Sequence, residues 1–542
     1  MKRIFTYILL TLIVVACHIE SPQTPVAQFR FTPEGGCTFP CTVKFTSESE
    51  NAASIQWDFG DGVKHTDLSV EHKFSSPGTY YVKLIVKGVD GGSSGITQMV
   101  HVDTVKPFSL SGDNNFPTDI ISDNNGNIYV SGTAKGQVDF GEQHKFTSKG
   151  GDDFFVAKFD STGQCLWLYS DGSVGNDHGN AIVLDKENNV YLTGFVAGTV
   201  SNWNNRPRGG VDGFVVKIDG KGKSDWVKTF GGPLDDQGRS LAFFQAGEGP
   251  NLYLVGTIEG DNVSINIDFD SNHQTQANGR DGFLALINTD DKQFTTVKTI
   301  SGPDIQAPET VAVDDQGNAY IAGAFLKSIQ IPGKASIQSV DSVDVFVAKW
   351  GLIPQNFLWA QRAGSPGVDF AYDIVVDRLR NVFVTGMHSG TFKDLPLQSD
   401  GDENVYLGKW DTNGNVLKAR NGFTNGVKDY HGGIALTDKG NIVIAGSFTN
   451  SAQFPMSRGR TISSNGGTDI IITEVDAEEL YQAGNFAARA GGVLEDRVNK
   501  ICVTKEGFVY ATGWFYGNAP YKNVELRGTS GVRNTFIVRY KL

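Results

Sequence analysis

A glycine that ends a short apolar run recurs through most of the sequence, and this repeat constrains the fold more than any other feature. The runs read IYVSG, VYLTG, LYLVG, AYIAG, VFVTG, IVIAG and VYATG. They end at Gly132, Gly194, Gly256, Gly323, Gly386, Gly446 and Gly513, so that successive copies are 60 to 67 residues apart. A fixed period of this length is the signature of one supersecondary unit used repeatedly. We therefore expect seven copies of one structural unit.

Each copy contains four short runs with the alternation and the β-branched or aromatic content of strands. In the second copy they include AIVLD, VYLTG, GFVVKID and WVKTFGG. Four antiparallel strands in each of seven copies predict a seven-bladed β-propeller. The 65 Gly, 35 Phe and 16 Tyr among 542 residues are typical of strands joined by tight turns. The expected fold class is all-β.

The end of the chain indicates how such a ring would close. FIVRYKL, residues 536–542, aligns with the third strand of the seventh copy, and a fourth strand is missing after it. VKPFSLSG, residues 105–112, matches a fourth strand and lies just before the first copy. We predict that this N-terminal segment pairs with FIVRYKL and completes the last blade, because closure removes free sheet edges.

Two marks recur over residues 105–542, GNxYVxG and GGxDxFVxK, and they resemble the bacterial SBBP-type β-propeller family. Copies three, four and seven depart from the second mark with NGRDGFLAL, DSVDVFVAK and GVRNTFIVR. The resemblance implies the propeller architecture. It implies no particular activity, because a fold does not determine a function.

Residues 26–104 alternate apolar and polar positions in short runs, which predicts a small antiparallel sandwich. WDFGDG, Trp57 to Gly62, followed by HKFSSPGTYYVKLIV resembles an Ig-like PKD domain, which implies a spacer or interaction module. Trp57 and Phe59 are expected in its core. Asp58 and Asp61 bracket a glycine turn and could cap that turn or bind Ca²⁺.

The N-terminus has the pattern of an export signal: Lys2 and Arg3 precede an apolar run that ends at Ala16. The sequence VVAC at its end resembles a bacterial lipobox, which implies a signal peptide at residues 1–16 and a lipid on Cys17. Residues 17–25 would then be a lipidated tether. His18, in place of the Asp that retains lipoproteins at the inner membrane, favours the outer membrane. An ordinary cleaved signal followed by a chance cysteine is the alternative.

The net charge argues against some classes of binding partner, and the cysteine spacing predicts a disulfide. The formal net charge is −13 and becomes −15 without residues 1–16, so nucleic acid and anionic lipid surfaces would be repelled. Cys37 and Cys41 in GGCTFPC are expected to form a disulfide in an oxidising compartment. Cys165 and Cys502 are expected to be buried small hydrophobes. We expect a monomer attached to the membrane only by its lipid.

Two rings of acidic and amide residues repeat with the copies. The linker ring precedes the first strands and comprises Asn115, Asp177, Asp236, Gln306, Asp369, Asp429 and Asp496. The third-strand ring comprises Asp153, Asp212, Asp281, Asp344, Asn404, Asp469 and Asn534. Both rings could bind cations, but a feature needed by every copy is more readily explained as turn capping by carboxylates. We therefore expect no metal and no cofactor.

A single asymmetric ligand should instead be recognised by residues that differ between copies. On the face where the linkers emerge, the candidates are Phe116, His178, Trp203, Gln237, Arg239, Phe370, Tyr372, Tyr430, His431 and Arg497. Aromatic rings combined with amides and Arg suit a hydroxylated ligand such as a sugar, although the same residues could pack between blades.

The sequence contains no recognisable catalytic pattern such as GxSxG or HExxH. The leading hypothesis is a non-enzymatic cell-surface lipoprotein at the outer membrane, whose propeller binds a glycan or protein while the sandwich acts as a spacer. A structural scaffold in an outer-membrane or secretion assembly is the second hypothesis. A polysaccharide-acting enzyme is the third.

Overall fold

The computed structural model describes residues 24–541 with short internal gaps. The gaps are residues 33–36, 39–41, 75–77, 104–107, 142, 204–206, 246–248, 262–264, 399–402, 423–428, 454–460, 522–523 and 529–530. The described part consists of strands and turns without a helix, as the all-β prediction requires, and thus offers no helix that could cross a bilayer. The expected signal peptide and Cys17 lie outside it.

The chain divides into two compact units between Asp103 and Thr104. In the first unit, one sheet has the order β1-β3-β6 and the other has the order β2-β8-β7-β4-β5. Their bounds are β1 Phe29–Thr32, β2 Cys37–Thr38, β3 Thr42–Ser47, β4 Ser54–Asp58, β5 Lys64–His65, β6 Ser69–Lys73, β7 Gly78–Lys87 and β8 Ser93–Asp103. The expectation of a wholly antiparallel sandwich is wrong at one place, because β2 pairs with β8 in parallel.

The core of the first unit lies between its two sheets. Trp57 and Phe59 are fully buried there, as predicted, and their rings stack 6.2 Å apart. The carboxylates beside them cap the glycine turn: Asp58 accepts an N–H bond from Gly60, and Asp61 accepts one from Val63. The second oxygen of Asp61 contacts His72 at 2.7 Å. Of the expected disulfide, Cys41 lies outside the described residues, so the pairing with Cys37 stays a prediction.

The second unit contains five four-stranded antiparallel sheets. The first two are β14 His178–Leu184, β15 Val190–Val196, β16 Asp212–Ile218 and β17 Ser224–Phe230, then β18 Gln237–Gln245, β19 Pro250–Glu259, β22 Arg280–Asn288 and β23 Gln293–Ile300. The next two are β24 Gln306–Val313, β25 Ala319–Ile329, β26 Ile337–Gly351 and β27 Asn356–Ala363, then β28 Asp369–Val376, β29 Val382–His388, β30 Asn404–Trp410 and β31 Val416–Asn421. The fifth is β32 Asp429–Leu436, β33 Ile442–Gln453, β34 Thr461–Val475 and β35 Gln482–Ala490.

The remaining strands form an eight-stranded sheet and two small hairpins. The large sheet has the order β13-β12-β10-β9-β40-β37-β36, with β11 paired to β10. Its bounds are β9 Phe108–Ser122, β10 Ile128–Asp139, β11 Lys145–Thr147, β12 Asp153–Phe159, β13 Cys165–Asp171, β36 Asp496–Val503, β37 Phe508–Phe515 and β40 Asn534–Lys541. The hairpins are β20 Ile265–Asp270 with β21 His273–Ala277, and β38 Asn518–Tyr521 with β39 Val524–Arg527.

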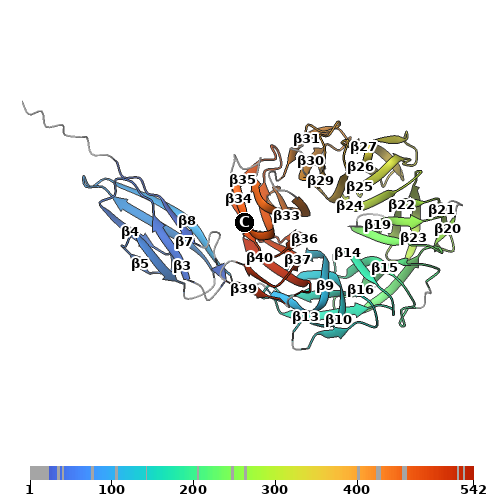
Figure 1. Cartoon of the computed structure of the whole chain (residues 1–542), viewed down its shortest axis with the longest axis horizontal. Coiled ribbons are helices and arrows are strands. Elements are labelled where there is room, and N and C mark those ends of the chain that lie inside the picture. Colours follow the sequence, from blue (N-terminus) through green and yellow to red (C-terminus); the bar gives the residue numbers. More distant parts are fainter. Residues whose placement is uncertain are drawn as a thin grey trace, which may run out of the picture. The chain divides into compact units, whose positions relative to one another are not determined.

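Strand β9 joins the two ends of the second unit. Its first residues, Phe108 to Leu110, pair with Ile537 to Thr535 of β40, which is the pairing predicted for FIVRYKL. Its later residues pair with β10. The sequence predicts a separate fourth strand at residues 105–112, whereas β9 continues without a break from Phe108 to Ser122. Figure 1 shows β9 beside β40 and β37, where the start and the end of the unit meet.

The first strand of each repeat lies on the inner side of the second unit. Strands β9, β14, β18, β24, β28, β32 and β36 each contact the next in this order, and β36 contacts β9 again. The sheets consequently surround a common centre (Figure 1). Large apolar side chains fill the space between neighbouring sheets; for example, Tyr129 and Phe154 of the first repeat pack against Leu192 and Phe214 of the second. Cys165 and Cys502 are both buried, as predicted.

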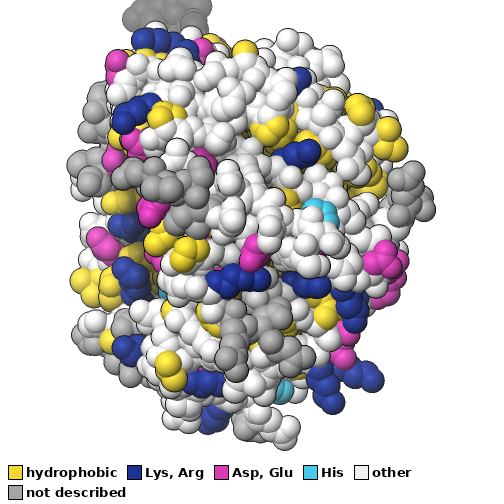
Figure 2. All heavy atoms as spheres, turned by 90° about the vertical axis from the view of Figure 1, so that its right-hand side faces the viewer, with side chains coloured by type: hydrophobic (Ala, Val, Ile, Leu, Met, Phe, Trp, Pro, Cys, Tyr) yellow, Lys and Arg dark blue, Asp and Glu magenta, His cyan; other side chains and the backbone are white. Residues whose placement is uncertain are grey.

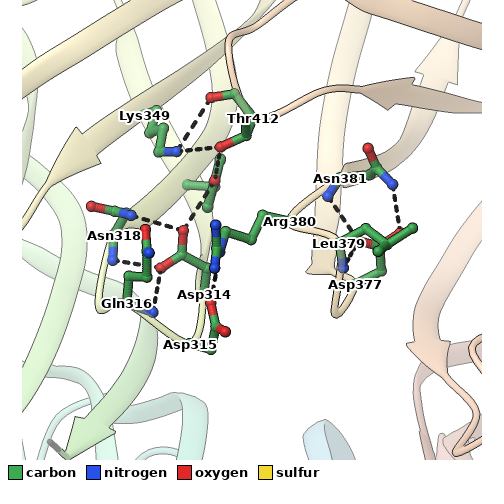
Figure 3. Close-up of polar contacts among 11 residues, drawn as sticks. Asp314, Asp315, Gln316, Asn318, Lys349, Asp377, Leu379, Arg380, Asn381 and Thr412 are labelled. Carbon is green, nitrogen blue, oxygen red and sulfur yellow. Dashed lines mark hydrogen bonds and ion pairs between the residues drawn. The ribbon is translucent and has the colours of Figure 1, made fainter.

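The turn between the first and second strands explains one of the recurring marks. In the fourth copy, Asp314 accepts backbone N–H bonds from Gln316 and Asn318, both at 2.9 Å (Figure 3). The Asn318 amide and the Tyr320 hydroxyl donate to its second oxygen. The Asn and Tyr of GNxYVxG are therefore partners of this carboxylate. The same Asp-to-Asn arrangement occurs at Asp123, Asp185 and Asp377.

Candidate ligand-binding site

Every first strand of the second unit contains one extra residue that the ladder to the second strand skips. In β14 the pairing passes from Gly179 to Ala181, and in β28 it passes from Ala371 to Asp373. The skipped residues, here called the bulge residues, are Thr118, Asn180, Arg239, Glu309, Tyr372, Gly432 and Asn499. A β-bulge of this kind redirects a side chain without ending the strand.

The bulge also gives a reason for the glycine that defines the repeat. Gly194 of β15 pairs with Gly179 beside the bulge of β14. A Cβ atom on Gly194 would collide with the carbonyl oxygen of His178. The two atoms would be much closer than 3.0 Å, and real Cβ atoms do not approach a neighbour so closely. The same collision with a first-strand carbonyl would occur at Gly132, Gly256, Gly323, Gly386 and Gly513. The repeated glycine therefore permits the bulge, and the bulge presents one variable residue per copy.

The bulge residues converge on one cavity of about 440 Å³, here called the central cavity. It is lined by residues of six first strands: Phe116, Thr118, Asp119, Asn180, Ala181, Arg239, Ser240, Glu309, Thr310, Tyr372, Asn499 and Lys500. Apart from Phe116, each of these is a bulge residue or the residue that follows one. Strand β32 has Gly432 and Gly433 at these positions and contributes no side chain.

Part of the wall of the central cavity holds the repeats together. The Asn180 amide donates to the carbonyl of Gly238 in the next repeat at 2.8 Å. Asp119 accepts an N–H bond from Ile182 of the next repeat at 2.9 Å, and Asp373 likewise accepts from Ile434 at 3.0 Å. These side chains bridge neighbouring first strands, so their role is structural.

Lys500 of the central cavity forms an ion pair with the buried carboxylate of Asp373. Lys500 Nζ lies 2.6 Å from Asp373 Oδ1. Burial lowers the pKa of Lys500, but Asp373 and Asp119 outweigh burial, and the pKa is raised overall. Burial raises the pKa of Asp119 to about 6, against the opposing effect of Lys500. Lys500 is therefore a permanent cation that is already neutralised by its neighbours.

Arg239, Glu309 and Tyr372 are the larger side chains that the central cavity offers to a ligand. Arg239 lies 3.8 Å from Glu309, and their side chains are 31% and 27% exposed. Burial raises the pKa of Glu309, and burial with the charge of Glu309 raises the pKa of Tyr372 to about 12. The Tyr372 phenol therefore keeps its proton and can donate a hydrogen bond. Guanidinium, carboxyl and phenol together can serve several hydroxyl groups.

A second cavity of about 600 Å³ adjoins the first and is here called the Phe116 cavity. It shares Phe116, Thr118 and Asn180 with the central cavity. Its other walls are Thr133, Lys135, Asp152, Asn176, His178 and Arg533. The His178 ring stacks on Phe195 at 4.7 Å, and burial lowers the pKa of His178, so that the ring is neutral at pH 7.

A row of alternating aromatic and Arg side chains leads to Phe116. The Arg497 guanidinium lies 3.6 Å from the Tyr430 ring centroid and 5.3 Å from that of Trp514. Arg533 lies 4.9 Å from the Trp514 centroid and 5.8 Å from that of Phe116. Cation–π contacts of this kind hold a guanidinium plane in place while its edges still face solvent or ligand.

The structure brings together only some of the sequence-predicted ligand residues. Phe116, His178, Arg239 and Tyr372 line the two cavities. Tyr430 and Arg497 belong to the aromatic row, and Phe370 lies 5.8 Å from Tyr372. Gln237 is half-buried at the start of β18 and lines neither cavity, while the side chain of His431 lies outside the described part.

Trp203 lies elsewhere. It is 8% exposed and packs against Phe154 and Phe214, at centroid distances of 5.9 and 5.1 Å. Its large apolar side chain fills the core between two sheets. Trp203 therefore has the packing role that was the alternative to ligand binding.

The carboxylates of the two rings accept backbone N–H bonds, as turn capping requires. Asp212 accepts from Arg208 at 2.7 Å, and Asp236 accepts from Gly232 and Glu259 at 2.6 and 3.0 Å. Among the described residues, no group of three or more His, Cys, Asp or Glu is arranged to hold a metal ion.

Sequence reasoning missed Thr118, Asn180, Glu309, Asn499 and Lys500. Six of the ten candidates lie one position after the linker ring, and only Arg239 and Tyr372 lie three positions after it, where the bulge residues are. The repeated glycine was the sequence signal for the bulge, because a glycine required in every copy indicates close approach of a neighbouring backbone.

On the face shown in Figure 2, acidic and basic side chains are interspersed, and hydrophobic side chains lie in small separate groups. Mixed charge of this kind is typical of a solvated surface.

Each of the two units matches a known protein family. The PKD domain family matches residues 20–104, which include every strand of the first unit. The first unit is a PKD domain. The SBBP family, described as a β-propeller repeat, matches residues 358–387, which run from β27 to β29 of the second unit.

The chain is also similar to parts of known proteins. The PKD1 domain of the Vibrio cholerae metalloprotease PrtV is 30% identical over 99% of its own chain and 15% of this one, with a TM-score of 0.14. Collagenase ColA of Clostridium perfringens is 28% identical over 134 residues, or 24% of this chain. Regulatory protein FlaEY of Caulobacter vibrioides is 25% identical over 243 residues, or 41% of this chain. The matches span only 12% and 24% of these two curated relatives.

Proposed function

We propose that the second unit is a seven-bladed β-propeller closed by β9 and that its central cavity binds a glycan without chemical turnover. Five blades would be the four-stranded sheets. The eight-stranded sheet would supply two more, because β9 pairs with β10 on one side and with β40 on the other. The protein would be a cell-surface lipoprotein, anchored in the outer membrane through Cys17, with the PKD domain as spacer.

The convergence of the bulge residues on one cavity carries this proposal. Six first strands place variable side chains there, although the backbone around them is repeated. Folding of the repeats requires only the residues that recur in every copy. Recognition of one asymmetric ligand requires residues that differ between copies, such as Arg239, Glu309 and Tyr372. Aromatic faces stack on sugar C–H groups, and the polar ends take sugar hydroxyls.

A glycan array tests the proposal, with the soluble form that begins at about residue 22. We expect selective binding of one glycan class and a loss of at least about tenfold in affinity for Tyr372→Ala. Tyr481→Ala is the matched control, because Tyr481 is also a tyrosine of similar exposure, 42% against 38%, and does not line the cavity. Capture of a protein partner without glycan binding would favour the scaffold hypothesis, and turnover of a bound glycan would favour the enzyme hypothesis.

A further inference from the structure

The Phe116 cavity contains two cations that no described carboxylate neutralises. Lys135 of β10 and Arg533, which lies just before β40, are both exposed at its wall. Neither forms an ion pair with an acidic residue in the part of the chain that the structure describes, although Lys500 and Arg239 of the central cavity do. The whole chain carries a net charge of −13, so two such cations at one cavity form a local positive site.

Arg533 is held with its guanidinium plane in place. The plane lies over Trp514 and Phe116, and Nε donates to the Tyr516 hydroxyl at 3.3 Å. The two terminal nitrogens make no hydrogen bond to another described residue. A guanidinium fixed in this way presents its N–H edge for paired hydrogen bonds to a carboxylate or sulfate group.

The other walls provide contacts for the uncharged parts of a sugar. The Phe116 ring offers an apolar face, and Thr118 and Thr133 offer hydroxyls. Asn176 accepts a bond from the Asp152 backbone N–H through its carbonyl oxygen, which leaves its amide group to donate. Asp152 is the acidic residue of the wall, 3.9 Å from the neutral His178 ring. Because Lys135 and Arg533 carry two positive charges against the single negative charge of Asp152, the cavity wall keeps a net positive charge.

We propose that the Phe116 cavity takes the anionic residue of an acidic polysaccharide, with Arg533 and Lys135 bound to its carboxylate or sulfate group and Phe116 stacked on the ring. This inference rests on the proposed glycan-binding function and adds the charge class of the ligand. The adjoining central cavity, whose charged side chains are already paired, would hold the neighbouring sugar residues.

Isothermal titration of the soluble protein with matched pairs of oligosaccharides tests the inference. The probes are an oligogalacturonate with its carboxyl-reduced form, and a sulfated galactan oligosaccharide with its desulfated form. We expect one acidic probe to bind at least about tenfold more tightly than its neutral partner, and to weaken as salt is raised. Preference for the first or the second pair identifies carboxylate or sulfate as the recognised group.

Charge variants complete the test. Arg533→Gln and Lys135→Gln should each reduce binding of the acidic probe by about tenfold or more. Lys221→Gln, an exposed lysine in the turn after β16, should leave it unchanged. Lys135 is exposed on a strand, so its variant should fold even if Arg533→Gln does not. Equal binding of neutral and acidic probes would overturn this inference and leave the proposed function standing, whereas no binding of any saccharide would overturn both.

Discussion

The side-chain amide of Asn499 donates a hydrogen bond to the carbonyl oxygen of Pro117 at 2.6 Å, across 382 positions of the chain. Asn180 makes the equivalent bond to Gly238, between two repeats that follow each other in sequence. Both asparagines are bulge residues, and both carbonyls belong to the residue before the bulge of the next strand. The first strand of the last repeat, β36, is thus joined to β9 of the first repeat by the same contact that joins consecutive repeats.

Removal of the first part of β9 should therefore open the second unit. A chain of residues 113–542 lacks the three pairs between Phe108–Leu110 and Thr535–Ile537. It loses several hydrogen bonds of about 1 kcal/mol each as well as side-chain packing. This loss is comparable with the whole stability margin of about 5–15 kcal/mol, so we expect aggregation or a strongly reduced melting temperature.

A chain of residues 104–542 is the control, because it lacks the PKD domain but keeps β9. Calorimetry or circular dichroism should show cooperative unfolding of this longer chain alone. Equal melting temperatures for the two chains would contradict the closing role of β9, and with it the proposed count of seven blades.

Much of this architecture could be predicted from the sequence, because each strand of the repeat carries its own signal. The pairing of FIVRYKL with the segment around Ser109 followed from counting strands. The continuity of β9 did not, because residues 105–112 match a separate fourth strand and nothing local shows that one strand pairs with both β10 and β40. Most of the central cavity was missed for a related reason: a bulge shifts the inward-facing position, and its register depends on pairing between strands. The packing of Trp203 likewise depends on Phe214 of another strand.

Substitution of the repeated glycine should be costly. In Gly194→Ala the new Cβ would collide with the carbonyl of His178. Either the bulge of β14 or the pairing with β15 must shift, so we expect the free energy of unfolding to fall by about 1–3 kcal/mol or more. Gly220→Ala is the matched control, because a Cβ there meets nothing within 4 Å. Chemical denaturation that gave the same result for both variants would contradict the proposed role of the glycine.

The lipid anchor rests on sequence alone and has a direct test. If Cys17 carries acyl chains, Cys17→Ser should abolish metabolic lipid labelling and release the protein from membranes. Fractionation of cells that express each form measures the release. Retention of the Cys17→Ser protein in the membrane fraction would mean that VVAC is not a lipobox.

The capping carboxylates should make stability depend on pH. Burial raises the pKa of Asp236 and Asp369 to about 7 and that of Asp344 to about 6. Because the folded state holds these protons more tightly, their contribution is complete below the unfolded pKa of about 4 and is lost as pH rises through 6 to 7. We expect the free energy of unfolding to fall between pH 5 and pH 8.

In Asp236→Asn the slope of the free energy of unfolding against pH should decrease by up to about 1.4 kcal/mol per pH unit, the value for one proton. Asp291→Asn removes the same charge from an exposed turn and should not change the slope. Denaturant titrations at four pH values would measure it, and stability that rose with pH across this range would mean that the buried carboxylates remain ionised.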